Sequence, residues 1–313
     1  MDMYRVVVTG ATSMLGAALI KECIKQNVEV LAIVRKGTSK LERLPQSGLL
    51  EVSACGMDQF ACMESREKRY DVFYHFAWAG TSRENRDNPV LQEENIRCTL
   101  DAVELAARLG CRKFIGAGSQ AEYGPRSGIV TADTKVSPQL AYGTAKYAAG
   151  QLSRKLCIQY GMVHIWGRIF SVYGTNDKEG TMLSYAIDRF IHGEKAYFSS
   201  AAQMWDYLYE DDAGKIFYLL GKCIEDSRVY CIADGKSRPL KEFIFEMREI
   251  FGDGAECKFA SDTGGVDAGL QPDTGSLFQD ISFQPEVKFR EGIRKMIDSR
   301  IKMQGGGPDK SLR

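Results

Sequence analysis

A tyrosine and a lysine stand four positions apart in the run Tyr142-Gly143-Thr144-Ala145-Lys146. On a helix, this spacing places both side chains on one face, in neighbouring turns. A free tyrosine titrates near pH ~10, so acid–base work at neutral pH requires roughly 4 kcal/mol of differential stabilisation. A nearby ammonium supplies part of that stabilisation. We therefore expect Lys146 to lower the pKa of Tyr142, and Tyr142 to act as general acid or base.

A serine turn upstream makes this common spacing specific. Ser119 lies 23 residues before Tyr142, inside the run FIGAGSQAEYG of residues 114–124. A hydroxyl at this place would hydrogen-bond the substrate oxygen that gains or loses a proton. The ordered set of Ser119, Tyr142 and Lys146 predicts a catalytic site rather than a chance pairing.

Glycines near the start of the chain predict a phosphate-binding turn. Gly10 and Gly16 follow the β-branched run Val6–Val8 and precede a helical pattern. In such a turn, backbone amides and the helix N-terminus face a pyrophosphate. A tight turn without a ligand is the alternative. The position of these glycines in the first strand-turn-helix unit favours a dinucleotide.

Together these motifs resemble the extended short-chain dehydrogenases/reductases, the family of the NAD(P)-dependent sugar-nucleotide epimerases, dehydratases and ketoreductases. The run TGATSMLG of residues 9–16 is similar to their T-G-x-x-G-x-x-G loop, with Ser13 in place of the middle glycine. Further similar segments extend over nearly the whole chain: HFAW at 75–78, RIFSVYG at 168–174, DYLYEDD at 206–212, QPDT at 271–274 and FQP at 283–285.

The resemblance assigns a role to each of these places. His75 is expected to be structural, Asn95 to support the active-site backbone, and Lys146 to hold the cofactor ribose. Substrate contacts are expected from Trp78, Ser119, Gln120, Trp205 and Arg238. Cofactor contacts are expected from Gly10, Thr12, Ser13, Met14, Leu15, Gly16, Arg35, Lys36, Gly56, Met57, Phe76, Ala77, Trp78, Asn95, Ala117, Gly118, Tyr142, Lys146, Phe170, Ser171 and Val172.

The residues after the second predicted strand bear on the choice of cofactor. An acidic residue there would bind the ribose hydroxyls of NAD. This chain has Arg35 and Lys36 instead, and both form charge-assisted contacts with phosphate. We therefore expect NADP(H) in preference to NAD(H). A solvated basic turn is the alternative interpretation.

The serine turn also narrows the reaction. Similar 4,6-dehydratases carry an Asp-Glu pair where this chain has Gln120 and Ala121. Dehydration is therefore disfavoured, with Glu122 an imperfect substitute one place later. The hypothesis placed first is an NADPH-dependent reductase that transfers hydride to C4 of a nucleoside-diphosphate 4-keto-6-deoxy-sugar, with Tyr142 as proton donor.

Other functions stay open at this point. One alternative is an NAD-dependent nucleotide-sugar 4-epimerase. Another is a non-catalytic NAD(P)-binding regulator, which the intact Ser119, Tyr142 and Lys146 disfavour. A third is a reductase of a carbonyl compound that carries no nucleotide, because Trp205 stands where many sugar-nucleotide enzymes have an arginine that grips the diphosphate. Arg238 would be a second source of that charge.

The elements that must position these residues alternate along the chain. Strand-like and helix-like segments in turn predict a doubly wound parallel sheet of Rossmann type (an α/β fold) with a smaller C-terminal substrate-binding cap. Strands are expected at Val6–Val8, Val28–Val34, Leu49–Ala54, Asp71–Ala77, Arg112–Ala117, Val163–Phe170 and Arg228–Ile232. Helices are expected at Ala17–Gln26, Leu91–Leu109, Tyr142–Tyr160, Thr181–His192, Asp211–Leu220, Leu240–Phe251 and Glu291–Ile301.

This pattern suggests a division of the chain. Residues 1–174 would form the dinucleotide-binding domain, to which 208–234 return. Residues 175–207 and 235–303 would form the cap, and 304–313 a disordered tail. Homodimerisation is expected through the helices at 91–109 and 142–160.

Composition excludes several classes of protein. The 41 basic and 41 acidic residues cancel, and no basic stretch favours nucleic acid. No apolar stretch reaches the ~18 residues of a membrane span. The nine cysteines form no C-x-x-C pair, and none of the three histidines lies at ligand spacing from a cysteine, so no metal site is expected. Reduced thiols and the absence of a signal-like leader favour a cytoplasmic protein.

Overall fold

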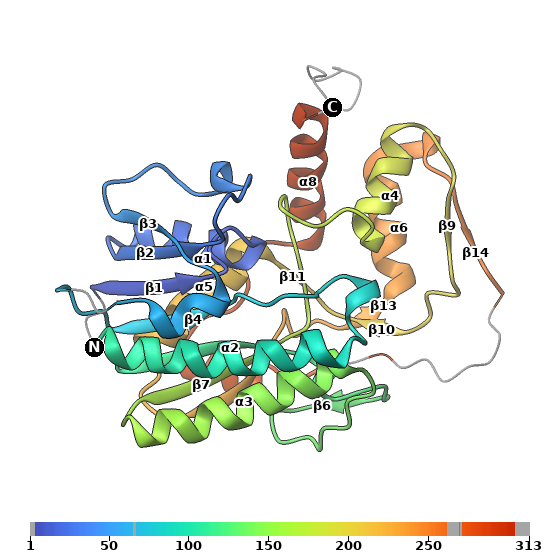
Figure 1. Cartoon of the computed structure of the whole chain (residues 1–313). Helices are drawn as coiled ribbons and strands as arrows, with labels where there is room; N and C mark the ends of the chain where they lie inside the picture. The colour runs from blue at the N-terminus through green and yellow to red at the C-terminus, as the bar shows by residue number, and fades with distance from the viewer. Residues whose placement is uncertain (1–3, 65–66, 262–268, 270, 304–313) are drawn as a thin grey trace.

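The computed structural model describes residues 4–64, 67–261, 269 and 271–303. Its centre is a seven-stranded parallel sheet of order β12-β7-β5-β4-β1-β2-β3 (Figure 1). The inner strands are apolar on both sides, as expected for a parallel sheet that is covered on both faces. The strands are β1 (Arg5–Thr9), β2 (Glu29–Val34), β3 (Leu50–Ala54), β4 (Val72–His75), β5 (Lys113–Ser119), β7 (Val163–Ile169) and β12 (Arg228–Ile232).

Two pairs of helices cover the two faces of this sheet. α1 (Met14–Lys25) and α5 (Glu210–Cys223) pack together on one face, and α2 (Pro89–Arg108) and α3 (Ala141–Gln159) on the other (Figure 1). Because side chains alternate along a strand, Val6 and Val8 of β1 enter the core beneath α1 and α5. Val7 enters the core beneath α2.

The predicted fold class is therefore confirmed, and the predicted strands and helices lie within a few residues of the observed ones. The first helix begins three residues before the predicted Ala17, because Ser13 caps it at Met14. The sequence analysis missed several short elements: β6 (Ile129–Val130), β8 (Ser171–Tyr173), β9 (Ala196–Phe198), β10 (Met204–Trp205), β11 (Tyr207–Tyr209), β13 (Arg238–Pro239), β14 (Cys257–Phe259), β15 (Gln271–Pro272) and α7 (Gly275–Ile281).

A smaller lobe lies beyond the carboxyl ends of the strands. α4 (Met182–Ile191), α6 (Leu240–Phe251) and α8 (Phe289–Met303) form it together with the pair β9 and β14 (Figure 1). Leu183, Phe190, Met247, Ile293 and Ile297 lie in its core. β8 and β11 pair in parallel and carry the chain between this lobe and the sheet.

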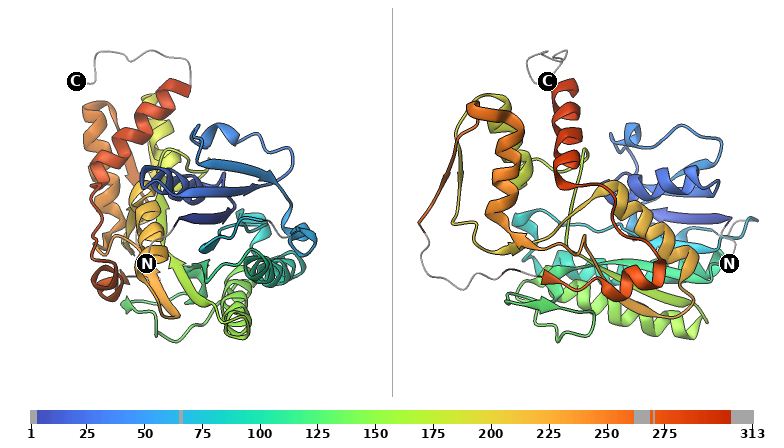
Figure 2. Two further views of the ribbon diagram at one scale, coloured as in Figure 1. Left: turned by 90° about the vertical axis from the view of Figure 1, so that its left-hand side faces the viewer. Right: turned by 180° about the vertical axis from the view of Figure 1, so that it is seen from behind.

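Two later segments pack on the main sheet. β12 pairs with β7 at its edge, and α7 lies against α5 and β12 (Figure 2). Leu277 and Ile281 of α7 enter the same core as Ile216 and Phe217 of α5. The expected tail at 304–313 lies outside the described residues. Within the described part of the chain, no helix is both long and apolar enough to cross a membrane.

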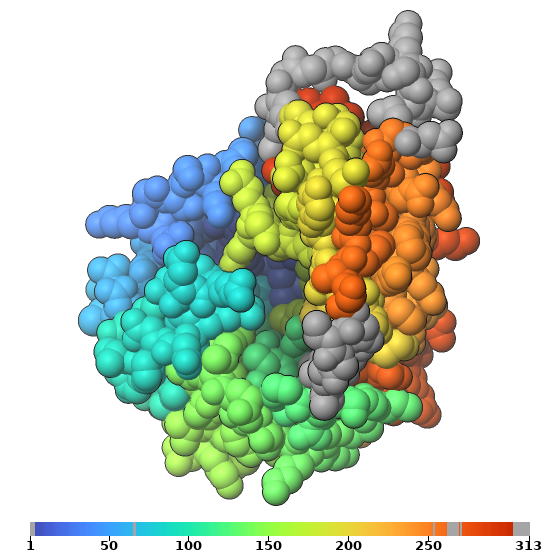
Figure 3. Space-filling model, turned by 90° about the vertical axis from the view of Figure 1, so that its right-hand side faces the viewer, coloured from blue at the N-terminus to red at the C-terminus, as the bar shows by residue number. Residues whose placement is uncertain are grey.

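The strand order reverses between β1 and β4, which are neighbours in the sheet. In doubly wound sheets, ligands bind outside the carboxyl ends of the strands at such a point. The space-filling view shows a hollow here, between the N-terminal part of the chain and the smaller lobe (Figure 3). The glycine loop and residues 76–78 lead into this region.

Candidate active site

The glycine loop follows β1 and lies against the end of β4. Gly10 has a φ of +65°, and a Cβ atom there would lie 2.7 Å from both the carbonyl carbon of Phe76 and the amide nitrogen of Ala77. Only glycine fits this conformation and this contact. The loop thus lies directly beside the backbone of residues 76–77, at the switch point of the sheet.

Ser13, which replaces the family's middle glycine, caps α1. Its Oγ accepts a hydrogen bond from the Gly16 amide at 3.0 Å. Thr12, Ser13, Met14 and Leu15 are half-buried, and the first turn of α1 contains no acidic residue. A helix N-terminus without a resident carboxylate suits a phosphate group. The loop therefore fits a dinucleotide.

The residues after β4 form hydrogen bonds with side chains of α2. Trp78 donates its indole Nε1–H to Oε1 of Gln92 on α2 at 2.9 Å. Asn95, also on α2, accepts a hydrogen bond from the Ala79 amide at 2.8 Å and donates to the Ala79 carbonyl at 3.2 Å. Asn95 thus holds the backbone of the 76–79 segment, the support that the resemblance implies.

His75 is buried beneath this segment. Its Nδ1 lies 2.9 Å from Thr9 Oγ1 and its Nε2 lies 3.3 Å from Thr99 Oγ1. Burial, assisted by the Lys146 charge, lowers the pKa of His75 to about 3. A neutral histidine with both ring nitrogens engaged fits the structural role expected for it.

The serine turn begins where β5 ends. Ser119 is 8 % exposed, and its Oγ accepts a hydrogen bond from the Ala121 amide at 3.2 Å. Gly118 precedes it on β5, and Gln120, half-buried, follows it. The Ser119 side chain also lies near enough to Tyr142 to lower the pKa of its phenol. Two of the three predicted catalytic residues are therefore neighbours.

Tyr142 lies in the first turn of α3, facing β5. Burial raises its pKa, while the neighbouring Ser119 side chain and the charge of Arg86 lower it to a smaller extent. The Arg86 guanidinium carbon lies 4.9 Å from the Tyr142 ring centroid, and the Arg86 carbonyl accepts the Tyr142 amide at 2.8 Å. The predicted lowering of the Tyr142 pKa by Lys146 is wrong for this structure.

The state of Lys146 explains this difference. Its ammonium donates to the Ala117 carbonyl at 2.7 Å and lies 3.6 Å from the Trp78 ring centroid, against 5.9 Å for the Tyr142 ring. Burial lowers the pKa of Lys146 to about 7, although the charge of Glu122 raises it. A lysine near half-protonation at neutral pH stabilises a phenolate only in part.

The predicted adenosine end lies at the other side of the switch point. Arg35 and Lys36 follow β2, are exposed, and make no side-chain hydrogen bond or ion pair within the described part of the chain. Gly56 and Met57 follow β3 and are half-buried, with the Gly56 amide donating to Gln59 Oε1 at 3.3 Å. The side chains of Arg35 and Lys36 are thus free to meet a ligand.

A cavity of about 740 Å³ lies beside the glycine loop, between the segment after β2 and the smaller lobe. Ser119, Tyr142 and Lys146 do not line it. Arg43 connects it to the loop by donating to the Thr12 carbonyl at 3.4 Å. Its walls carry more cations than carboxylates: Lys21, Lys40, Arg43, Lys178 and Arg300 against Glu42, Asp177 and Glu179.

The two predicted substrate residues of the smaller lobe lie opposite each other. Trp205 on β10 pairs with Arg238 on β13 in an antiparallel ladder. Arg238 forms an ion pair with Glu246 of α6, and its guanidinium carbon lies 3.9 Å from the Phe243 ring centroid. Of the remaining predicted cofactor contacts, Phe170 is buried against the Tyr123 ring, and Ser171 and Val172 on β8 are half-buried.

Residues 6–233 match the model of the NAD-dependent epimerase/dehydratase family. The chain belongs to this family. Its members are enzymes of the NAD(P)-dependent oxidoreductase type, so the family predicted from the motifs and the enzyme class are both confirmed. The family match spans the glycine loop, the serine turn and α3, which carry the site described above.

Individual family members resemble the chain along most of its length. An uncharacterised UDP-glucose epimerase of Bacillus subtilis, YtcB, is 20 % identical over 94 % of this chain and 96 % of its own. The structure of a UDP-glucuronic acid 4-epimerase from Bacillus cereus in complex with NAD has a TM-score of 0.82 at 18 % identity, covering 99 % of this chain and 100 % of that one. A dTDP-6-deoxy-L-talose 4-dehydrogenase (NAD(+)) of Aggregatibacter actinomycetemcomitans is 30 % identical over 45 % of this chain and 51 % of its own.

The sequence analysis missed several residues of this site. Arg86 and Gln92 contact Tyr142 and Trp78 from the loop after β4 and from α2. Arg86 has no sequence signal, whereas Gln92 is a polar residue on the buried face of a helix, 1 % exposed. Such a position favours a side chain that bonds a fixed partner.

Proposed function

We propose that this enzyme is an NAD(H)-dependent 4-epimerase of a nucleotide sugar. The observation that carries the proposal is the grouping of Ser119 beside Tyr142, with the Lys146 ammonium 5.9 Å from the Tyr142 ring centroid on the same helix. The full-length likeness to two sugar-nucleotide epimerases adds support. The sequence alone favours a reductase; the comparisons favour the epimerase, which we therefore place first.

In this reaction Tyr142 takes the proton from the C4 hydroxyl as hydride leaves C4. It returns the proton to the C4 oxygen after the 4-keto sugar has rotated to present its other face. Ser119 hydrogen-bonds the same oxygen and holds it next to the Tyr142 phenol. Lys146, in its protonated form, places a positive charge beside Tyr142 and holds the cofactor ribose. When bound, the nicotinamide supplies the acceptor and donor for the C4 hydride.

A second candidate is the reductase of a nucleoside-diphosphate 4-keto-6-deoxy-sugar with NADPH as the hydride donor. Arg35 and Lys36 support it, because both are exposed, form no side-chain bond with the described residues and would give a 2′-phosphate two cations at the end of β2. The partial likeness to a 4-dehydrogenase supports the same C4 chemistry without epimerisation. Dehydration remains disfavoured, because Gln120 and Ala121 carry no acid or base.

The two candidates predict different cofactor balances. For the epimerase, purified protein should convert UDP-glucose, UDP-N-acetylglucosamine or UDP-glucuronate into its 4-epimer, detected by NMR, with no net change of cofactor. For the reductase, oxidation of NADPH at 340 nm should accompany consumption of a 4-keto-6-deoxy-sugar nucleotide. Conversion of none of these would contradict both candidates.

Tyr142→Phe tests the proton transfer in either case. Loss of the phenolic hydroxyl should lower kcat by about 10²- to 10⁴-fold with an unchanged melting temperature. Tyr147→Phe, five positions on in α3, is the matched control. A Tyr142→Phe variant with wild-type turnover would exclude the proposed mechanism.

We further propose that two copies of the chain associate through α2 and α3. Leu152 and Ile158 of α3 are 47 % and 61 % exposed, which suits an apolar contact between copies. Leu152→Glu together with Ile158→Glu should convert a dimer into a monomer in light scattering coupled to gel filtration. A wild-type protein that is already monomeric would exclude this arrangement.

A further inference from the structure

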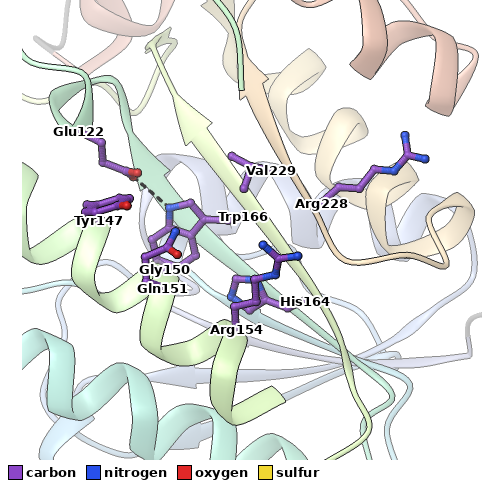
Figure 4. Close-up of a pocket in the computed structure, with 9 residues that line it drawn as sticks. All are labelled: Glu122, Tyr147, Gly150, Gln151, Arg154, His164, Trp166, Arg228 and Val229. Atoms are coloured by element: carbon purple, nitrogen blue, oxygen red, sulfur yellow. Dashed lines mark hydrogen bonds between the residues drawn. The ribbon is translucent and has the colours of Figure 1, made fainter. Parts of the chain in front are cut away.

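A buried carboxylate lies directly behind the serine turn. Glu122 is completely buried, although the proton transfers above do not use it. Its Oε1 accepts hydrogen bonds from the Ser119 amide at 2.9 Å and from Trp166 Nε1 at 3.0 Å, and its Oε2 accepts one from Arg168 Nε at 2.8 Å. Figure 4 shows the Glu122 carboxylate directed at the Trp166 indole. A buried charge with three donors is a built arrangement.

Glycines make the space that the Trp166 ring occupies. A Cβ atom on Gly116 or Gly118 of β5 would lie 2.3 Å from an atom of the indole, and one on Gly150 of α3 would lie 2.7 Å from it. The indole is therefore enclosed between β5 and α3, and its Nε1–H has a fixed direction. A cavity of about 10 Å³ beside it has room for at most one water molecule (Figure 4). Trp166 thus holds Glu122 in place rigidly.

Arg168 fixes the second carboxylate oxygen and balances its charge. The side chains of Arg168 and Glu122 are 5 % and 0 % exposed. Arg168 Nη1 donates to Tyr123 Oη at 3.1 Å and to the Ala132 carbonyl at 2.8 Å. Because a buried ion pair gains free energy only with such additional bonds, the whole group behaves as one unit. This group is joined to the reaction residues through the Ser119 amide, which donates to Glu122.

We propose that Glu122 is a positioning residue for the reaction: it fixes the Ser119 turn through the Ser119 amide and places a negative charge behind Tyr142 and Lys146. Ser119 is then held at both ends, since its amide donates to Glu122 and its Oγ accepts the Ala121 amide at 3.2 Å. The hydroxyl proton of Ser119 therefore stays available for a hydrogen bond to the C4 oxygen of the substrate, with which Tyr142 exchanges a proton. This inference rests on the proposed function, which gives Ser119 its role.

The same geometry removes Glu122 from the list of acids that could act on a substrate. Both carboxylate oxygens are occupied by donors from β5 and β7, and none of the side chain is exposed. The interpretation of Glu122 as an imperfect substitute for a dehydratase acid is therefore wrong. Its influence on the chemistry passes through Ser119 and through its charge.

That charge acts on both reaction residues in the same direction. It raises the pKa of Tyr142 and the pKa of Lys146. Among the described residues, the other charged or titratable groups facing this pair are Arg86 beside Tyr142, His75 beside Lys146, and Arg168 paired with Glu122. Removing only the Glu122 charge should therefore lower both pKa values together. A change in packing alone would not do so.

Two substitutions separate the effect of the Glu122 charge from the effect of its side-chain length. Glu122→Gln keeps the length and removes the charge, so both limbs of the pH–rate profile should move to lower pH. Glu122→Asp keeps the charge but is one methylene shorter, so it should lower kcat by about 10- to 100-fold and leave both limbs in place. KM for the sugar nucleotide should change by less than kcat in both variants.

Glu210→Gln is the matched control. Glu210 is also buried, and it accepts hydrogen bonds from the Thr175 amide and hydroxyl at 2.7 and 2.6 Å, in another part of the fold. The Glu210→Gln substitution should lower the melting temperature without moving the pH–rate profile.

If Glu122→Gln does not fold, Trp166→Phe offers a second test. It removes one donor to the Glu122 carboxylate and should lower kcat without moving the pH–rate profile. Wild-type kcat and wild-type limbs in Glu122→Gln, or wild-type kcat in Trp166→Phe, would overturn the proposal.

The pH dependence of cofactor binding keeps this test separate from the reaction. The dissociation constant of NADH, measured by fluorescence from pH 5.5 to 9, reports the ionisation of Lys146 without any sugar present. Its midpoint should lie lower in Glu122→Gln than in the wild type and in Glu122→Asp. If the midpoint is lower in Glu122→Gln but the wild type converts no sugar nucleotide, only the proposed function is contradicted. An unmoved midpoint would contradict the role of Glu122.

Discussion

The Lys146 ammonium lies 3.6 Å from the ring centroid of Trp78. The Tyr142 ring meets the same indole edge-on, with centroids 6.1 Å apart. Gln92 fixes the indole by accepting its Nε1–H and by donating to the Gly80 and Asn85 carbonyls at 3.0 and 3.1 Å. The π face of Trp78 thus attracts the positive charge of Lys146, which burial disfavours.

Trp78→Leu should therefore favour neutral Lys146. Loss of a cation–π contact of about 0.5–2 kcal/mol lowers the Lys146 pKa further below its value of about 7. NADH binding should weaken by about 2- to 30-fold at pH 7.5 and less at pH 6, where the ammonium persists. Trp78→Phe keeps an aromatic ring, so its NADH dissociation constant should lie between those of Trp78→Leu and the wild type. Equal dissociation constants for Trp78→Leu and wild type at both pH values would contradict this account.

Arg86→Gln should move the Tyr142 titration in the opposite direction from Glu122→Gln. The Arg86 charge lowers the pKa of Tyr142, so its removal raises that pKa. The limb of the pH–rate profile on which activity rises with deprotonation of Tyr142 should shift to higher pH. The backbone bond from the Tyr142 amide to the Arg86 carbonyl is unaffected. Arg83→Gln, in the same exposed loop, should leave this limb in place.

The sequence predicts the frame of this site well, for physical reasons. Buried parallel strands such as Val6–Val8 are continuous apolar runs, and α3 follows a helical period, so both are visible in local patterns. Gly10 is visible as well, because only glycine fits its backbone. These local signals determine where Ser119, Tyr142 and Lys146 must lie in the fold.

The electrostatics of the site depend on contacts that no local pattern contains. Glu122 meets Trp166 and Arg168 across 44 and 46 residues of sequence. The Lys146 ammonium turns toward Ala117 and Trp78, from two different strand ends. Motif spacing gives the neighbours of Tyr142 along its helix, but neither its burial nor the presence of Arg86. The pKa predicted from spacing therefore has the wrong direction.

Two buried histidines should make the fold sensitive to acid. His164 stacks between Phe114 and Trp166, with ring centroids at 6.0 and 5.9 Å, and its Nε2 lies 2.8 Å from Ser153 Oγ. Burial, with a smaller effect of the Arg154 charge, lowers its pKa from 6.5 to about 3. The folded state stays neutral between these values while the unfolded state binds a proton. Stability is thus present above pH ~6.5 and is lost as the pH falls toward ~3.

His164→Phe removes this titration and keeps an aromatic ring in the stack. The free energy of unfolding, from urea titrations at pH 7.5 and pH 4.5, should fall less on acidification than in the wild type, by roughly 2–3 kcal/mol. The lost bond to Ser153 lowers stability equally at both pH values, so it cancels in the difference. His192→Phe, at an exposed position after α4, should keep the wild-type difference. An identical difference in His164→Phe would contradict neutral burial of His164.

The opposed pair of Trp205 and Arg238 gives the test of substrate binding in the smaller lobe. Arg238 is half-buried and shares its charge with Glu246, and Trp205 occupies the facing position of the ladder. If Arg238 contacts the diphosphate, Arg238→Gln removes a charge-assisted bond of about 1.5–3 kcal/mol. KM for the sugar nucleotide should then rise by about 10- to 100-fold at nearly constant kcat, while NADH binding stays as in the wild type. Arg248→Gln, exposed on the same helix α6 as Glu246, is the charge-matched control. An unchanged KM in Arg238→Gln would assign Arg238 to the packing of β13 on α6, through Glu246 and the Phe243 ring, and would leave the diphosphate to other residues.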